Sequence, residues 1–313
     1  MTTVYFDRSI PDDLRRAKLN HDGHLFAYSP NPHSLALVEL ARELLSDAFG
    51  GRDPRTAQYH YPVEQYAQIL SEVKPRFIHH PECKRIIPSL LESHGCDPET
   101  TYFDVPRLRS STAHDYLTTG IAYAFHAHRD TWYSAPLCQI NWWLPIYDVD
   151  DDNALAFHPD YWRKPIGNSS EIFNYQSWNS NNRFNAVQHL KHEDRPHPKP
   201  TETVGWDPSI VVIAAPGAPL LFSASHLHSS IPNTSEETRF SIDFRVVNLE
   251  DLRTLDGAPN LDCRCTGSAI GDYLRASDLS HLPADLQSIY LPGHPQPVRA
   301  EPAMAESALP EPA

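Results

Sequence analysis

The sequence predicts a mainly β protein, a sandwich or barrel, with helices packed on its outside. Two observations lead to this prediction. From Thr101 onward, short apolar or alternating runs are separated by turn-rich stretches, which is typical of many short strands. Before Thr101, apolar residues recur at helical spacing. We therefore divide the chain into a helical N-terminal scaffold at 1–100, a β core at 101–282, and a Pro/Ala/Glu-rich tail at 283–313 whose end we expect to be disordered.

Helices are predicted at three places in the scaffold. Ser34–Phe49 has apolar residues at helical spacing, Ser34 as its candidate N-cap, and Gly50–Gly51 as a stop. Tyr61–Val73 is the second candidate, and Pro88–Ser93 is assigned to a third. We expect these helices to pack against the β core.

Strands are predicted wherever a short apolar or alternating run lies between turn signals. The candidates are Thr101–Val105, Ile121–His128, Cys138–Tyr147, Ala154–His158, Ile210–Ala214, Leu220–His228 and Arg239–Val247. Between them, 168–200 is polar and rich in Asn, His and Pro, without a strong period. Long insertions in compact domains are usually functional lids or mobile segments, and the sequence leaves the role of this one open.

Composition narrows the class of function. The formal net charge of -14 argues against a nucleic-acid partner, because phosphate binding needs a basic face. The longest apolar runs are far shorter than the roughly 20 residues of a membrane helix, so we expect no membrane association. The N-terminus does not resemble a secretion signal, and five cysteines are an odd count for a disulfide framework. We expect a cytoplasmic protein that handles a small molecule, and its oligomeric state stays open.

The candidate metal ligands are His128, Asp130 and His228. Residues two apart on a strand point to the same face, so His128 and Asp130 can present an imidazole and a carboxylate to one point. A distant strand end supplies the third ligand, His228. Two histidines and one carboxylate with open positions suit iron(II) that must also bind a cosubstrate and oxygen. The register leaves His126 and His226 as rivals, since each shares a face with its neighbour.

Arg239 makes this constellation more specific. It follows His228 by eleven residues, and the turn-rich sequence between them predicts a hairpin. Arg239 would then begin the next strand, close to the metal. Its guanidinium can grip the far carboxylate of 2-oxoglutarate with two hydrogen bonds. Arg245 shares the face of Arg239 and is the rival for this role, with a structural ion pair to Asp243 or Glu250 as the alternative.

Three blocks resemble the phytanoyl-CoA dioxygenase-like branch of the iron(II)/2-oxoglutarate-dependent oxygenases. They are His128-Arg129-Asp130, the segment from Asp152 to Pro159, and His228-Ser229-Ser230 followed by Arg239, and together they span roughly 123–247. Ala154 stands where the family usually has glycine, and Ala218 replaces its usual acidic residue. These departures concern turns and strand ends.

The resemblance implies a double-stranded β-helix, a jelly-roll or cupin-like core with flanking helices. It implies iron(II) on His128, Asp130 and His228, and 2-oxoglutarate anchored by Arg239 with Ser230 beside it. The implied reaction is hydroxylation of a small-molecule metabolite with O2, releasing succinate and CO2. An aspartate at position 130 argues for hydroxylation, or a related desaturation or cyclisation, and against halogenation, because halogenating relatives have a small residue there.

Other side chains are candidates for the surroundings of the metal. Gln139, Asn141 and Trp143 share one face of a predicted strand and could line the cosubstrate or substrate site, with ordinary packing as the alternative. Arg107 and Arg109 could hold an acidic substrate at the entrance, although surface ion pairs are the commoner role. Two other functions stay open: a cupin-like metalloenzyme that does not use 2-oxoglutarate, such as an isomerase or a cosubstrate-free dioxygenase, and a non-catalytic jelly-roll binding module.

Overall fold

Two β-sheets form the centre of the structure, a computed structural model that describes residues 1–205 and 210–290. The larger sheet has the strand order β1-β2-β8-β5-β10-β3-β11, with β4 also paired to β10, and the smaller has the order β7-β6-β9. The larger sheet consists of β1 (Val4–Phe6), β2 (Leu25–Ala27), β3 (Thr101–Phe103), β4 (Arg107–Ser111), β5 (Ile140–Pro145), β8 (Leu220–Ser223), β10 (Arg239–Asn248) and β11 (Leu274–Arg275). The smaller consists of β6 (Leu155–Phe157), β7 (Ile210–Val212) and β9 (His228–Ser230).

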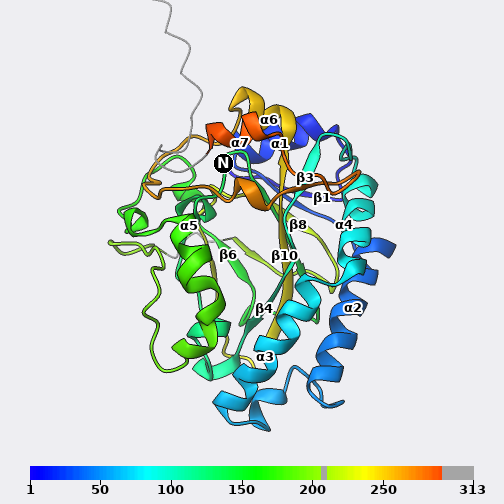
Figure 1. Cartoon of the computed structure of the whole chain (residues 1–313), viewed down its shortest axis with the longest axis vertical. Helices are drawn as coiled ribbons and strands as arrows, with labels where there is room; N and C mark the ends of the chain where they lie inside the picture. Colours follow the sequence, from blue (N-terminus) through cyan, green and yellow to red (C-terminus); the bar gives the residue numbers. More distant parts are fainter. Residues whose placement is uncertain (206–209, 291–313) are drawn as a thin grey trace, which may run out of the picture.

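The two sheets share an apolar core between their facing sides. Leu220 and Phe222 of β8 pack with Leu155 and Phe157 of β6 in one buried cluster. The rings of Phe157 and Phe222 lie 5.0 Å apart in an edge-to-face arrangement. This core joins the two sheets, and Figure 1 shows β6 lying across from β8 and β10.

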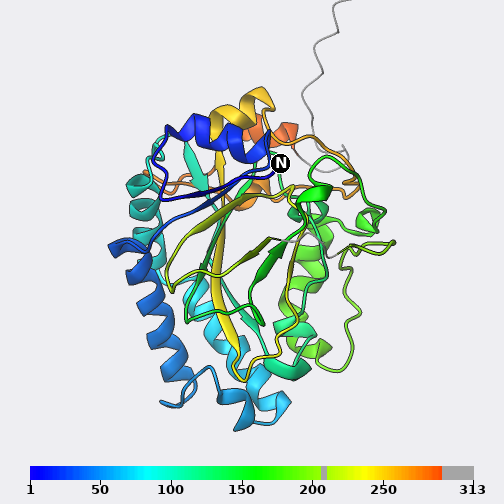
Figure 2. The same cartoon turned by 180° about the vertical axis from the view of Figure 1, so that it is seen from behind.

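Helices cover the outer side of the larger sheet. They are α2 (Pro32–Ala48), α3 (Val63–Ile78) and α4 (Pro81–Ser93), and both views show them along one side of the sheet (Figures 1 and 2). Short helices α1 (Asp12–Asn20), α6 (Leu249–Thr254) and α7 (Ala284–Ile289) lie together at one end. Two β-sheets with flanking helices are therefore confirmed, and the double-stranded β-helix stays a prediction.

Strand β10 shows how the sequence builds this arrangement. Its alternate residues Phe240, Ile242 and Phe244 are fully buried in the core that contains the helices. The residues between them, from Arg239 to Arg245, point to the other side, because successive side chains on a strand face opposite ways. One strand thus contributes an apolar face to the scaffold and a polar face to the space between the sheets.

The N-terminal third differs from its prediction in two details. The N-cap of α2 is Asn31, whose side chain accepts hydrogen bonds from the backbone of His33 and Ser34, and Ser34 is the third helical residue of a capping box. The Ser34 N-cap was therefore wrong. In addition, β1 and β2 lie in this third, and β2 pairs with β8 and extends the larger sheet.

Two strand predictions and one hairpin prediction need correction near the site. Ile121–His128 is not a strand: it contains a 3-10 turn at Gly120–Ala122 and then irregular chain. Leu220–His228 is two strands, β8 and β9, in different sheets. His228 and Arg239 consequently do not form a hairpin, because β9 pairs with β6 whereas β10 pairs with β3, β4 and β5.

The insertion at 168–200 contains α5 (Tyr175–Ser177), a π-helical turn at Trp178–Asn182 and a 3-10 segment at Arg183–His189. In the C-terminal part, Leu286 of α7 and Tyr290 belong to a buried cluster. The predicted disorder falls on 291–313, outside the described residues. None of the helices in the part of the chain that the structure describes is long and apolar enough to cross a membrane.

Candidate metal centre

A short backbone bridge brings the three predicted ligands together. The amide of His128 donates to the carbonyl oxygen of His228 at 2.9 Å, and the reciprocal bond is 3.0 Å long. The sequence predicts that Asp130 lies on one strand with His128. In the structure, Asp130 instead begins the 3-10 helix Asp130–Tyr133. The turn, and not strand periodicity, therefore brings its carboxylate back toward His128.

The ligand atoms of His128, Asp130 and His228 all lie within 4.8 Å of one another. Oδ1 of Asp130 is 3.3 Å from Nε2 of His128 and 3.9 Å from Nε2 of His228. Both histidines are more than nine-tenths buried. The rivals are placed elsewhere: the side chain of His126 is exposed, and the ring of His226 contacts the Gly23 carbonyl oxygen at 3.1 Å.

Backbone carbonyl groups fix the orientation of both imidazoles. Nδ1 of His128 lies 2.8 Å from the carbonyl oxygen of His126, and Nδ1 of His228 lies 3.0 Å from that of His226. A proton on each Nδ1 can be donated to these oxygens, which leaves Nε2 as a free lone pair toward Asp130. In both cases the acceptor belongs to the histidine two residues earlier. His126 and His226, the rival candidates, therefore hold the ligand rings through their backbone carbonyl groups.

The surroundings of Asp130 and His228 keep these two side chains in the protonation states that binding of a cation requires. Burial alone raises the pKa of Asp130, but the hydrogen bond with His128 and the charge of Arg245 outweigh it and hold that pKa well below its usual range. Burial, followed by the nearby His128, lowers the pKa of His228 to about 4. At neutral pH the site is a carboxylate with a neutral imidazole at His228, as metal binding requires. Two imidazoles and one carboxylate match the donor set of a mononuclear iron(II) site.

Arg239 begins β10 of the larger sheet, but its guanidinium is held by groups in or next to the smaller sheet. Its Nη2 donates to Oγ of Ser230 at 2.9 Å, and its Nη1 donates to the carbonyl oxygens of Asn153 and Ala154 at 2.6 and 3.1 Å. Ser230 is two residues beyond His228, about 7 Å along the strand. The guanidinium is therefore bound to the residue two positions beyond the candidate ligand His228.

No carboxylate of the described residues forms an ion pair with Arg239. Its side chain is buried, its Nε lacks a hydrogen-bond partner, and burial lowers its pKa to about 10. A buried charge is normally paired. The rival Arg245 is paired: its Nη1 is 3.2 Å from Oδ2 of Asp104, and its Nε is 3.9 Å from Oδ2 of Asp130. Arg245 thus orients a metal ligand, whereas Arg239 has a charge left for an anion.

The predicted lining residues form a polar chain beside Arg245. Tyr273 donates to Oε1 of Gln139 at 2.6 Å, and Nε2 of Gln139 donates to Oδ1 of Asn141 at 2.8 Å. Asn141 lies opposite Arg245 in the sheet, and its Nδ2 is buried without a hydrogen-bond partner. Trp143 is buried, and the Arg239 guanidinium carbon lies 6.0 Å from its ring centre. These side chains share the inner face of the larger sheet.

Arg107 and Arg109 both lie in ion pairs. Nη1 of Arg107 is 2.6 Å from Oδ2 of Asp104, and Nε of Arg109 is 2.6 Å from Oδ1 of Asp243. Arg109 also lies over the ring of Phe125, 5.5 Å from its centre. The ion-pair role that the sequence analysis weighed as the commoner one is thus present for both, and Arg109 remains partly exposed beside an aromatic side chain.

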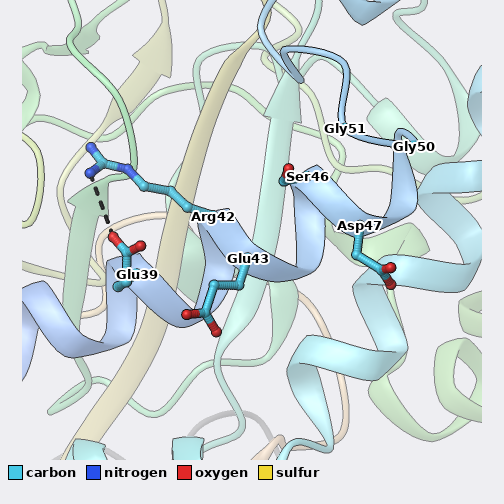
Figure 3. Close-up of a pocket in the computed structure, with 7 residues that line it drawn as sticks. All are labelled: Glu39, Arg42, Glu43, Ser46, Asp47, Gly50 and Gly51. Atoms are coloured by element: carbon cyan, nitrogen blue, oxygen red, sulfur yellow. Dashed lines mark ion pairs between the residues drawn. The ribbon is translucent and has the colours of Figure 1, made fainter.

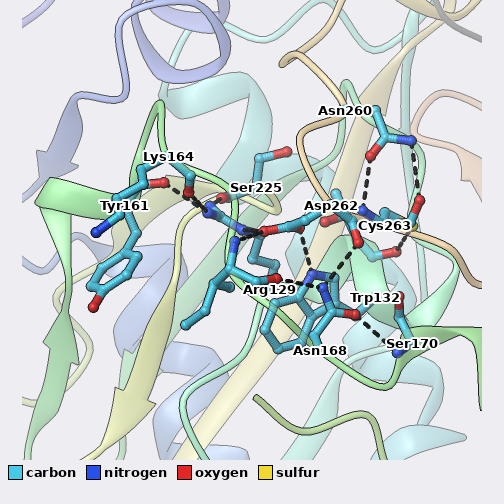
Figure 4. Close-up of polar contacts among 12 residues, drawn as sticks. Arg129, Trp132, Tyr161, Lys164, Asn168, Ser170, Ser225, Asn260, Asp262 and Cys263 are labelled. Carbon is cyan, nitrogen blue, oxygen red and sulfur yellow. Dashed lines mark hydrogen bonds and ion pairs between the residues drawn. The ribbon is translucent and has the colours of Figure 1, made fainter. Parts of the chain in front are cut away.

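A buried network fixes the loop that carries the ligands (Figure 4). Arg129, between the two ligands, is 2% exposed and makes an ion pair of 3.1 Å with Asp262. It also donates to the carbonyl oxygens of Tyr161 and Lys164, while Trp132 donates to the second oxygen of Asp262 at 2.7 Å. Asp262 therefore ties the metal loop to a segment more than a hundred residues later. The role of Asp262 could not be predicted from the sequence, because no pattern of residues around it indicates a buried ion pair.

Aromatic rings from two parts of the chain form a wall beside the candidate ligand His128. The ring of Phe125 stacks on that of His128 at 5.0 Å, and the ring of Tyr133 meets it edge-on at 5.6 Å. From the insertion, His197 lies 5.7 Å from Phe125 and 5.0 Å from Trp178 between ring centres. His197 is 5% exposed and neither of its ring nitrogens has a hydrogen-bond partner. Sequence reasoning identified the insertion but not these residues.

The open pocket drawn in Figure 3 is a separate feature. It lies on α2 and its C-terminal turn and has a cavity volume of about 580 Å³. Its lining residues are Glu39, Arg42, Glu43, Ser46, Asp47, Gly50 and Gly51. Three carboxylates against one arginine, on a solvent-facing helix, do not form a site for an anionic cosubstrate.

Comparisons with known proteins give only distant likenesses. No family model and no curated protein matches the chain. Similar solved structures include a non-heme monooxygenase, ThoJ, in its apo form (14% identity, 75% of this chain and 76% of that chain, TM-score 0.38). Others are EvdO2 from Micromonospora carbonacea var. aurantiaca complexed with 2-oxoglutarate (14%, 56% and 62%, 0.37) and the epimerase SnoN in complex with Fe3+, alpha ketoglutarate and nogalamycin RO (14%, 75% and 81%, 0.39). At this identity and TM-score the likeness defines neither a family nor an activity for this chain.

Proposed function

We propose that the chain is an iron(II)- and 2-oxoglutarate-dependent oxygenase that hydroxylates a small molecule. The observation that carries the proposal is the buried, unpaired charge of Arg239 next to the strand that supplies His228. His128, Asp130 and His228 would hold the metal, and Arg239 with Ser230 would hold the far carboxylate of 2-oxoglutarate. Iron with 2-oxoglutarate and O2 supplies the oxidation of a C–H bond, with release of succinate and CO2.

The remaining residues position these groups. Arg245 holds Oδ2 of Asp130, so that Oδ1 faces the two imidazoles. The unpartnered Nδ2 of Asn141 is a donor on the same face of the sheet, available to a cosubstrate oxygen. A cupin-like metalloenzyme without 2-oxoglutarate would use the same triad, but it would leave the buried charge of Arg239 without a function.

Anaerobic reconstitution with iron(II) and 2-oxoglutarate tests this proposal. We expect a weak visible charge-transfer band that Asp130→Ala and His228→Ala abolish and that His126→Ala retains. Arg239→Met should still bind iron(II) but should need far more 2-oxoglutarate to develop the band. A chain that binds iron(II) without any band and forms no succinate would support the cupin-like alternative, and one that binds no metal would support the binding module.

The aromatic wall points to the class of substrate. Flat rings at Phe125, Tyr133 and Trp178 favour a substrate with an aromatic or otherwise flat, unsaturated part. Burial lowers the pKa of His197 to about 3, so its neutral ring offers one donor and one acceptor to an oxygen substituent. Glu193 lies 3.7 Å from Nε2 of His197, beyond hydrogen-bond distance, and is already paired with Arg195 at 2.7 Å.

A succinate assay against a panel of aromatic natural products and aliphatic amino acids tests this substrate class. We expect the aromatic compounds to stimulate succinate formation most. With such a compound, His197→Phe should raise KM about tenfold, the loss of one hydrogen bond, and leave the 2-oxoglutarate affinity unchanged. Stimulation by aliphatic amino acids alone would contradict the assignment.

A further inference from the structure

Cys263 and Cys265 lie together behind the metal loop. Their sulfur atoms are 3.2 Å apart, and both donate to the carbonyl oxygen of Thr131, at 2.9 Å from Cys263 and 3.3 Å from Cys265. Thr131 directly follows the candidate ligand Asp130 and is 1% exposed. The other three cysteines, which are Cys83, Cys96 and Cys138, are buried and free.

We propose that Cys263 and Cys265 are a redox modification site that a peroxide oxidises to a disulfide. The sulfur atoms need to approach by only about 1 Å to reach bonding distance. Cys263 is partly exposed, which admits a small oxidant to the pair, and Cys265 beside it, which is 3% exposed, supplies the sulfur that attacks the oxidant. Neither the metal nor 2-oxoglutarate takes part in this step.

The chemistry balances with one peroxide for each pair of thiols. A thiolate sulfur attacks one peroxide oxygen, so the O–O bond breaks, a sulfenic acid forms and one water leaves. The second sulfur then attacks the sulfenic sulfur, which forms the S–S bond and releases the OH as a second water. The two thiols lose two electrons and hydrogen peroxide gains them, while both thiol protons end in water.

Two features of the surroundings favour this oxidation. The thiol of Cys263, followed by the hydroxyl of Ser134, stabilises the thiolate of Cys265 and lowers the pKa of that thiol. The thiolate is the nucleophile that attacks a peroxide, so Cys265 reacts first and the sulfur of Cys263 then closes the disulfide. Asp262, directly before the pair, is anchored to Arg129 and Trp132 and holds this segment against the metal loop.

Oxidation would also act on the metal loop, an effect that rests on the proposed function. The disulfide removes the S–H group of Cys263 that donates to the carbonyl oxygen of Thr131 at 2.9 Å. The loss of one hydrogen bond corresponds to about a tenfold change in an equilibrium constant. We therefore expect the metal affinity of the loop to fall about tenfold in the oxidised protein, with the fold unchanged.

Thiol titration and intact-mass measurement of the full chain test the proposal. After brief treatment with hydrogen peroxide, we expect the five thiols of the denatured chain to fall to three, with a mass loss of two hydrogen atoms that dithiothreitol reverses. Cys263→Ser and Cys265→Ser should each prevent this change, while Cys83→Ser should retain it. A pair that stays reduced while Cys138 is oxidised, or a disulfide that forms in either serine variant, would overturn the proposal.

Manganese(II) titration separates this proposal from the proposed function. We expect the oxidised wild type to bind manganese(II) about tenfold more weakly than the reduced protein, with the same far-UV circular dichroism. A disulfide that forms without any change in manganese(II) affinity overturns the link to the metal loop. If manganese(II) does not bind even the reduced protein, the metal centre is wrong, and the thiol result still decides the fate of the dithiol site.

Discussion

Replacing Arg239 by methionine should remove the anchor for 2-oxoglutarate while preserving the metal centre. Burial moves the pKa of Arg239 from 12.5 to about 10. At about 1.36 kcal/mol for each pKa unit, holding this charge in the interior costs about 3 kcal/mol. The folded pKa is lowered, so the cost is fully present at every pH below about 10 and fades only as the pH rises from there toward 12.5. At neutral pH an anionic ligand that pairs with Arg239 can offset this cost.

The same magnitude sets the expected loss of affinity. About 3 kcal/mol corresponds to roughly a hundredfold change in a dissociation constant. We expect the Kd of 2-oxoglutarate for the manganese(II)-loaded protein to rise roughly a hundredfold in Arg239→Met. Arg239→Lys should lose somewhat less, because lysine keeps the charge but not the two-pronged geometry. Calorimetric titration of 2-oxoglutarate into each loaded variant measures these constants without turnover.

Arg109→Met is the matched control for this experiment. Arg109 lies on the same face of the larger sheet, but its charge is already paired with Asp243. We expect this variant to bind 2-oxoglutarate within about threefold of the wild type, a difference below 1 kcal/mol. Equal losses in Arg109→Met and Arg239→Met would refute the reasoning from the unpaired charge, as would wild-type affinity in Arg239→Met.

Four further variants test other parts of the site. Asp130→Asn should abolish tight manganese(II) binding, and His126→Ala should retain it, because only the backbone carbonyl group of His126 contacts a ligand. Electron paramagnetic resonance of the free manganese(II) ion measures binding in both variants. Loss of binding in His126→Ala with binding retained in Asp130→Asn would favour His126 as the ligand. Asp262→Ala should lower the free energy of unfolding by about 3–5 kcal/mol, since it leaves Arg129 buried without its counter-charge; a loss below about 1 kcal/mol in urea unfolding would argue against the network. Burial lowers the pKa of His226 to about 3, so the neutral ring stabilises the fold above pH 6.5 and this stability is lost as the pH falls toward 3. Replacing His226 by glutamine should reduce the pH dependence of the unfolding free energy in that window by about 1.4 kcal/mol per pH unit, and an unchanged slope would contradict its buried state.

The sequence predicted best those elements whose residue spacing is determined by different neighbours on their two faces. β10 alternates strictly because the helices need Phe240, Ile242 and Phe244 on one side and the inner space needs polar groups on the other. The start of α2 was missed by only two residues, since its capping box involves both Asn31 and Ser34. Local chemistry decided these elements, and local chemistry can be seen in a sequence.

The segment before the metal ligands shows where this reasoning stops. Ile121–His128 has the composition of a strand, but contacts with the insertion hold its beginning in a turn. The amide of Gly120 donates to Glu193 at 2.9 Å, and Oγ1 of Thr119 donates to the carbonyl oxygen of Leu190 at 2.8 Å. These partners are some seventy residues away. No local pattern reports them, and the predicted strand failed for that reason.

The two arginines of β10 differ in a way that only the fold could decide. Both point into the space between the sheets, six residues apart on one face, and the sequence left them as rivals. The backbone amide of Arg245 donates to Oδ1 of Asp104 at 2.7 Å, and its guanidinium meets the second oxygen of the same carboxylate. Arg239 instead meets three neutral oxygen atoms from the smaller sheet and its edge. Because Asp104 neutralises Arg245 and no acid within 1–205 and 210–290 neutralises Arg239, the strand carries one cation that orients a candidate metal ligand and one that is available to an anionic cosubstrate.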